Sequence, residues 1–283
     1  MDSHQHFWRY TPQDYGWISD TMPAIQRDFL PHDLEPLLQA AGFDGCIAVQ
    51  ARQSEAETDF LLDLAEESSI VKGVVGWVDL QAPDLEARLE HYASFPTLKG
   101  FRHIVQDEPD DQFLLRPAFV EGVRLLHKYH FKYDILIYEK QMPTAVAFVD
   151  RLGDQPLVLD HIGKPLIAEG PTLRWTDGIK ALAQYPHVYC KISGLVTEAA
   201  WHQWKPDDFK PFLDIAFDAF GPDRLMIGSD WPVCLLAADD YAEVIGLVEG
   251  YVAGFSEEDR IRILGANAER FYGVSNRTPV RLI

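Results

Sequence analysis

The stretch Asp2-Ser-His4-Gln-His6 places two imidazoles two residues apart, almost at the start of the chain. In an extended strand, side chains two positions apart point to the same face, so His4 and His6 can grip one metal ion or one substrate oxygen. Two more such residues end short apolar runs far along the chain, His161 in Leu157-Val-Leu-Asp-His161 and Asp230 in Leu225-Met-Ile-Gly-Ser-Asp230. Active sites of α/β barrels lie at the carboxyl ends of the strands, so these stretches together predict a barrel.

Short β-rich runs alternate with amphipathic stretches along the whole chain, which predicts a parallel sheet with helical crossovers. We expect eight strands, over residues 2–6, 46–51, 71–79, 98–105, 133–138, 157–161, 188–194 and 225–230. Helical spacing covers residues 32–41, 55–68, 83–94, 116–129, 142–152, 175–184, 206–220 and 238–250, and a last helix is expected from Ser256, as its N-cap, to Tyr272.

Eight repeats in 283 residues fit a closed barrel better than an open doubly wound sheet. Neither a G-x-G-x-x-G motif nor a P-loop follows an early strand, so the main reason to predict a nucleotide-binding sheet is missing. No linker or low-complexity segment divides the chain. We therefore predict an α/β protein with a single distorted (β/α)8 TIM barrel over residues 1–283.

Composition limits the possible partners. Lys and Arg number 25 against 44 Asp and Glu, which gives a formal net charge of −19 and disfavours nucleic acid and anionic membrane surfaces. No apolar run approaches 18 residues and no basic-then-apolar leader opens the sequence, so we expect a cytoplasmic protein, or one whose leader has been removed. Cys46, Cys190 and Cys234 lack CxxC spacing, so we expect neither disulfides nor a cysteine zinc site.

The long segment 7–31 carries Trp8, Tyr10, Tyr15 and Trp17 and joins the first strand to its helix. Loops at the carboxyl ends of barrel strands hold function. We therefore expect this segment to fold over the mouth of the barrel as a partial lid.

His4, His6, His161 and Asp230 end strands 1, 6 and 8, and strands 1 and 8 are neighbours in a closed barrel. These side chains are therefore expected to converge, as ligands of one Zn²⁺ or similar divalent ion. Asp230 is then placed to act as the general base toward water. Each residue also has a structural interpretation: the histidines as hydrogen-bonding anchors and Asp230 as a turn-forming residue.

The chain resembles the amidohydrolase superfamily, in its branch of sugar-lactone and pyrone-dicarboxylate lactonases, and within it L-fuconolactonases and L-rhamnonolactonases. The matching motifs span nearly the whole sequence: residues 2–8, Leu98-Lys-Gly-Phe-Arg102-His103, Leu159-Asp-His161-Ile-Gly-Lys-Pro165, 191–195, Gly228-Ser-Asp230-Trp-Pro232 and 265–273. The resemblance implies a distorted (β/α)8 barrel with Asp230 as general base, His161 at the catalytic centre, and Arg102 in contact with substrate.

Binuclear members of the superfamily place a histidine at the end of strand 5, where this sequence has Ile135-Leu-Ile-Tyr138-Glu139. That difference argues against a two-metal site and weakens the alternative of an aromatic-acid decarboxylase. We expect one divalent metal ion, Zn²⁺, and the resemblance leaves open whether activity requires it, because some members of the branch are thought to hydrolyse lactones without a metal.

Aromatic and amide side chains near the predicted mouth suit a neutral polyhydroxylated ring better than a dianion, which needs several basic groups. We expect Arg102, Trp8, Gln50, Trp77 and Tyr138 to bind substrate. The predicted function is hydrolysis of an aldonolactone, L-fuconolactone or L-rhamnonolactone, by water that Asp230 activates. A 2-pyrone-4,6-dicarboxylate lactonase is the main alternative, and a non-catalytic sugar-acid or metal-binding protein is a further one.

Overall fold

A computed structural model describes residues 1–274 as one eight-stranded parallel sheet in the order β1-β2-β3-β4-β5-β6-β7-β8. The strands are β1 (Asp2–Gln5), β2 (Cys46–Val49), β3 (Val71–Gly76), β4 (Leu98–Ile104), β5 (Lys132–Leu136), β6 (Leu157–Leu159), β7 (Val188–Ile192) and β8 (Leu225–Ile227). All eight are almost entirely buried, which explains their nearly continuous apolar sequences. The predicted (β/α)8 barrel is confirmed.

The segment that follows β8 closes the barrel against β1. The amide of Asp230 donates to the carbonyl of His4 over 2.8 Å, and the amide of His6 donates to the carbonyl of Trp231 over 2.7 Å. The Asp2 carboxylate supports this seam from inside, where it accepts from the Ser229 hydroxyl and amide and from the Tyr241 hydroxyl. The seam therefore joins the two ends of the sheet and places His4 beside Asp230.

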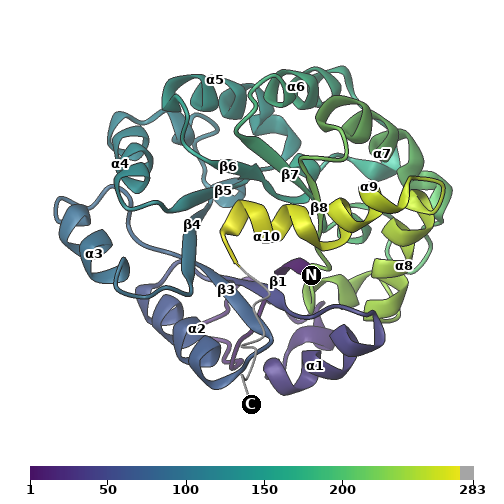
Figure 1. The fold of residues 1–283 in the computed structure, drawn as a ribbon, viewed down its shortest axis with the longest axis horizontal. Helices are drawn as coiled ribbons and strands as arrows, with labels where there is room; N and C mark the ends of the chain where they lie inside the picture. The colour runs from purple at the N-terminus through teal and green to yellow at the C-terminus, as the bar shows by residue number, and fades with distance from the viewer. Residues whose placement is uncertain (275–283) are drawn as a thin grey trace, which may run out of the picture.

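Helices surround the strands (Figure 1). They are α1 (Pro31–Ala40), α2 (Glu55–Glu67), α3 (Leu85–Tyr92), α4 (Pro117–Lys128), α5 (Met142–Leu152), α6 (Leu173–Ala183), α7 (Pro206–Phe220), α8 (Tyr241–Val252), α9 (Glu257–Ile261) and α10 (Asn267–Tyr272). Each helix from α1 to α8 buries an apolar stripe, such as Phe209, Leu213 and Phe217 on α7, against the outside of the barrel. Within residues 1–274, no helix has the length and apolar character to cross a membrane.

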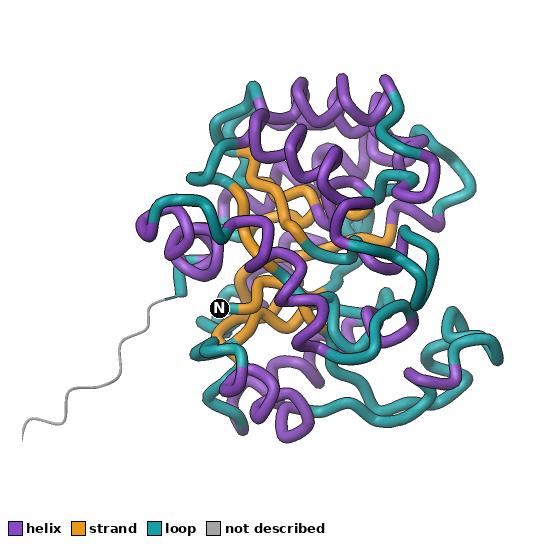
Figure 2. Tube along the Cα trace, turned by 90° about the vertical axis from the view of Figure 1, so that its right-hand side faces the viewer, coloured by secondary structure: helices purple, strands orange, loops and turns teal. Residues whose placement is uncertain are grey.

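Helix α10 covers the end of the barrel where the strands begin, and it lies across that end in Figure 1. Phe271 and Tyr272 pack with Met1 and the inward-facing side chains of β2 and β8, and Asn267 donates to the carbonyl of Leu225. Longer loops gather on the side away from the N-terminus (Figure 2). One end is thus sealed, which leaves the carboxyl ends of the strands for a site.

The structure corrects several predicted boundaries. The strands expected to end at His161 and Asp230 stop earlier, at Leu159 and Ile227. The reason is that His161 and Asp230 adopt left-handed backbone angles, with φ of 55° and 58°. The helix predicted over 256–272 begins at Ser256, whose side chain accepts from the Asp259 amide, but a π-helical segment (Arg262–Ala266) interrupts it. The predicted single domain extends to 283, and residues 275–283 lie outside the described residues.

We expect Asp2→Ala to lower the free energy of unfolding by about 3 kcal/mol, because the Ser229 and Tyr241 hydroxyls lose their buried charged acceptor. Tyr241→Phe removes a single hydrogen bond and should cost about 1 kcal/mol. Urea denaturation with a wild-type m-value measures both changes. Wild-type stability of Asp2→Ala would contradict the proposed importance of the seam.

Candidate functional site

His4 and His6 leave the same face of the first strand and converge on Asp230. The Nε2 atom of His6 lies 3.2 Å from Asp230 Oδ1, and that of His4 lies 3.8 Å from the same oxygen. All three side chains are buried. The convergence expected from the H-x-H spacing is therefore present at the barrel seam.

The hydrogen bonds around these histidines fix which ring nitrogens face Asp230. His6 Nδ1 lies 2.7 Å from the Val49 carbonyl, which only accepts, so Nδ1 carries a proton and Nε2 is turned toward Asp230. His4 Nε2 lies 3.2 Å from Arg102 Nη1, which only donates, so this nitrogen accepts. The Nε2 atoms of both imidazoles and a carboxylate oxygen of Asp230 thus face one another. This donor set fits a divalent metal.

His161 is held by an unusual turn at the end of β6. His161, Ile162, Gly163 and Lys164 all have positive φ, between 45° and 72°. This turn, residues 161–164, places the imidazole over the barrel, where Nδ1 lies 2.9 Å from the Ser193 hydroxyl. Burial lowers the pKa of His161 to about 4, so its ring is neutral at pH 7.

A close approach behind the ring fixes the position of His161. Gly194 on the neighbouring β7 loop has a φ of 58°, and a Cβ there would lie 2.4 Å from His161 Nδ1. Only glycine leaves room for the imidazole in this arrangement. The neutral ring therefore has little freedom to move away from Asp230.

Asp230 is ionised in its buried position. Burial alone would raise the pKa of its carboxyl, but His161, whose ring is protonated at the acidic pH where this carboxyl titrates, and then His6 outweigh that effect and hold the pKa below its usual value. The carboxylate is consequently available as a proton acceptor at neutral pH.

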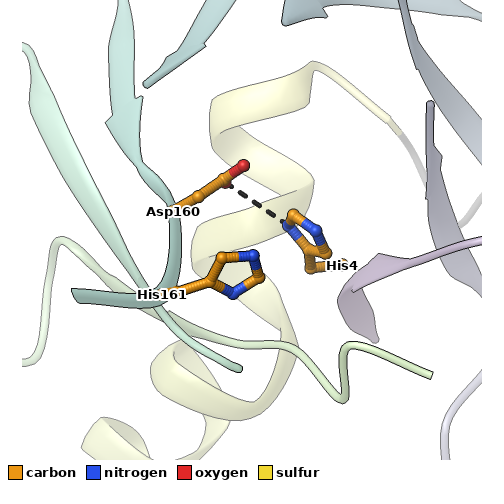
Figure 3. A group of neighbouring side chains, drawn as sticks. All are labelled: His4, Asp160 and His161. Atoms are coloured by element: carbon orange, nitrogen blue, oxygen red, sulfur yellow. Dashed lines mark ion pairs between the residues drawn. The ribbon is translucent and has the colours of Figure 1, made fainter. Parts of the chain in front are cut away.

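A buried ionic cluster lies beneath His4. Lys191 Nζ lies 2.5 Å from Asp134 Oδ2 and 2.9 Å from Asp160 Oδ1, and Arg102 Nη1 donates to Asp160 Oδ2 over 3.0 Å. The Asp160 carboxylate points toward His4, with 3.3 Å between Oδ1 and Nδ1 (Figure 3). Asp160 therefore orients His4 so that Nε2 faces Asp230, in the way that outer carboxylates orient metal-binding histidines.

The charges of this cluster control its protonation. Burial favours the neutral form of Asp160, but Lys191, His4 and Arg102 overcome that effect and keep its pKa well below the usual value. Burial outweighs Lys191 at Asp134, whose pKa rises to about 6. Asp134 and Asp160 are not among the site residues predicted from the sequence. An aspartate directly before His161 in the matching motif was the available signal.

A cavity of about 120 Å³ opens above this group. His6, Arg102, His161 and Asp230 supply its polar lining, together with Gln106, Asp107 and Lys164; its apolar lining is Trp17, Ala51, Ile104, Leu136 and Val233. Larger surface grooves, of about 500 and 620 Å³, contain none of the converging histidines, so chemistry and not size selects this cavity. Its mixed lining suits a small, polar ring compound.

The residues predicted to bind substrate occupy different places. Arg102 lines the cavity, whereas Trp8 is fully buried against Tyr15 and Phe29 and does not line it. Trp17, from the same segment, lines the cavity instead. The partial lid predicted for residues 7–31 thus contributes one aromatic side chain.

Gln50, Trp77 and Tyr138 also lie outside the immediate cavity lining. Gln50 is buried and its amide donates to the Arg102 carbonyl, so it supports Arg102. Trp77 is half-buried beside the His103 ring. Tyr138 is 36% exposed at the mouth, and the Lys164 ammonium lies 5.3 Å from its ring centre.

The free energy of unfolding should fall as the pH drops from about 6.5 to 4, because unfolded His161 takes up a proton that the folded protein refuses until about pH 4. His161→Gln removes this contribution. Urea denaturation in chelator should give a wild-type slope steeper than that of the variant by up to about 1.4 kcal/mol per pH unit. Parallel curves for the two proteins would show that His161 is not a depressed titrating group.

The chain is similar to known proteins over nearly its whole length. The family model described as amidohydrolase matches residues 1–274. An L-fucono-1,5-lactonase from Burkholderia multivorans is 45% identical, over all of this chain and 98% of that protein. A second L-fucono-1,5-lactonase, from Burkholderia ambifaria, is 38% identical over 97% of this chain and 95% of that protein.

A solved structure has the same fold and contains a metal ion. It is the crystal structure of an amidohydrolase from Burkholderia multivorans with bound zinc, which has a TM-score of 0.92 and 46% identity and covers 97% of this chain and 99% of that chain. The match of the family model to nearly the full length, the relatives and the shared barrel lead to one conclusion: this chain belongs to the amidohydrolase family.

Proposed function

We propose that this protein hydrolyses sugar lactones, with L-fucono-1,5-lactone as the preferred substrate. The observation that carries the proposal is the ionised, buried Asp230 in a cavity that it shares with neutral His161 and cationic Arg102. The two L-fucono-1,5-lactonases that align over nearly the whole chain support the substrate class. The proposed substrate is a small neutral molecule, and the proposed location is the cytoplasm.

In the proposed reaction, Asp230 accepts a proton from a water molecule while the water oxygen attacks the lactone carbonyl carbon. Arg102 flanks Asp230 in the cavity and is suited to donate a hydrogen bond to the oxygen that gains negative charge. The ring C–O bond then breaks, and Asp230 returns its proton to the departing hydroxyl. The products are the sugar acid and the regenerated carboxylate.

His4, His6 and Asp230 would hold one divalent ion, Zn²⁺ in this proposal, with His161 as the candidate fourth ligand. When bound, the ion supplies Lewis-acid polarisation and lowers the pKa of water. The Nε2 atoms of His4 and His6 that face Asp230, together with the zinc in the solved relative, support this assignment. The buried carboxylate of Asp160 behind His4 would keep that ring in its binding orientation.

A pyrone dicarboxylate fits the cavity less well than a neutral lactone. Its two carboxylates need excess positive charge, yet the charges of the two cationic lining residues, Arg102 and Lys164, are balanced by the neighbouring carboxylates of Asp160 and Glu198. The decarboxylase alternative is weaker still, because it calls for a histidine at the end of β5, where Leu136 lines the cavity instead.

Asp230→Asn should reduce kcat for L-fucono-1,5-lactone by about 10³-fold, because an amide cannot accept the water proton. A pH-indicator assay of acid release, corrected for spontaneous opening of the lactone, measures the change. Circular dichroism should match the wild type, since the backbone bond from residue 230 to His4 is retained. Turnover within a few-fold of wild type would exclude Asp230 as the general base.

Chelated protein should bind one Zn²⁺, and His6→Ala should weaken that binding at least about tenfold, because it removes a ligand. Competition with a fluorescent zinc chelator reads this affinity independently of catalysis. His32→Ala, at an exposed histidine on α1, is the matched control. Equal affinity of His6→Ala and wild type would place any bound metal elsewhere.

A further inference from the structure

The Lys164 side chain has no role in the proposed reaction, yet the 161–164 turn presents it at the cavity. Lys164 has a φ of 45°, a conformation that L-residues rarely adopt, and it lines the cavity with His161 and Asp230. Strained backbone of this kind gathers at functional sites. The turn that positions His161 therefore brings an ammonium group to the same opening.

Lys164 faces a carboxylate from a different strand. Its Nζ lies 3.5 Å from Oε1 of Glu198, in the short 3-10 segment (Val196–Glu198) after β7. That distance is long for a charge-assisted hydrogen bond, which usually measures about 2.7–2.9 Å. The side chains of Lys164 and Glu198 are 14% and 17% exposed. Both groups therefore retain hydrogen-bonding capacity toward a ligand at the mouth.

The pair of Lys164 and Glu198 lies beside the aromatic ring of Tyr138. The ring of Tyr138 lies 5.3 Å from Lys164 Nζ. Asp107 lines the same cavity as Lys164. A donor, an acceptor and an aromatic face together are suited to a hydroxylated ring.

We propose that Lys164 and Glu198 bind two neighbouring hydroxyl groups of the lactone and so select polyhydroxylated substrates. Lys164 Nζ donates to one hydroxyl oxygen, and Glu198 accepts from the next hydroxyl. Oxygens on adjacent ring carbons lie about as far apart as these two atoms, so the pair can be bridged by one diol. This inference rests on the proposed lactonase function and adds specificity-determining residues to it.

The alternative role for the pair is a structural one, in which it ties the 161–164 turn to the loop after β7. Loss of such a structural contact would change the turnover of every substrate and would also lower the stability of the fold. Recognition of hydroxyls affects only substrates that carry them, because an unpaired donor and acceptor remain when the hydroxyls are absent.

The test compares L-fucono-1,5-lactone with δ-valerolactone, a six-membered lactone that has no hydroxyl groups. Lys164→Met should raise KM for the sugar lactone at least about tenfold, with kcat changed less than about threefold. The kcat/KM for δ-valerolactone should stay at the wild-type value; where the wild type does not turn it over, its inhibition constant serves instead. Lys164→Arg retains a cation and should partly restore KM.

Glu198→Gln should raise KM for the sugar lactone by a smaller factor, because the amide oxygen still accepts. Lys210→Met is the matched control, since Lys210 pairs with Asp214 on α7 away from the cavity and should leave all constants unchanged. Thermal unfolding of each variant should match the wild type.

Unchanged KM for the sugar lactone in Lys164→Met would overturn the recognition role. So would equal losses on both lactones, or a loss confined to kcat. A wild-type enzyme that is inactive on every sugar lactone would instead overturn the proposed function itself, so the two failures are distinguishable.

Discussion

The attraction between Asp160 and two buried cations, Arg102 and Lys191, is the interaction on which the site depends. Desolvation makes buried ion pairs poor sources of stability compared with well-packed apolar groups. This cluster nevertheless sits directly beneath His4, with Asp134 as its second carboxylate. Its consequence is orientation: it sets the His4 ring so that Nε2 faces Asp230, and it fixes Arg102 at the cavity.

The backbone supplies the complementary constraint from the other side of the cavity. His161 and Asp230 both adopt left-handed angles directly after short strands, so each side chain turns inward at the barrel mouth instead of following the sheet. Gly194 has no Cβ and so leaves space for the His161 ring. The carbonyl of His4 accepts a hydrogen bond from the Asp230 amide. Rigid main-chain geometry and buried charge thus hold the same small group of side chains from two directions.

Local patterns in the sequence were sufficient to predict the barrel, because alternating strand and helix periodicities extend over the whole chain. They also predicted that His4, His6 and Asp230 converge, since strand order alone makes the first and last strands neighbours. Asp160 escaped prediction because strict strand alternation would place it on the opposite face from His161. The turn that brings both inward is made by tertiary contacts and leaves no periodic signal.

Aromatic residues show a similar limit. Trp8 and Trp17 lie in one segment and look equally suited to a binding role, yet packing with Tyr15 and Phe29 buries Trp8 completely and leaves Trp17 at the cavity. Which of the two meets the cavity depends on how a long loop folds back on itself. Long-range packing decides such questions, and residue type does not.

The seam between β1 and β8 forms late in the synthesis of the barrel. The hydrogen bond from Ser229 to Asp2 spans 227 residues, so the first strand to leave the ribosome receives its second neighbour only when the last strand has been synthesised. Until then His4 and His6 stand without Asp230. A partial barrel therefore lacks the complete set of acceptors, so this group of side chains can hold a cation only after the barrel has closed.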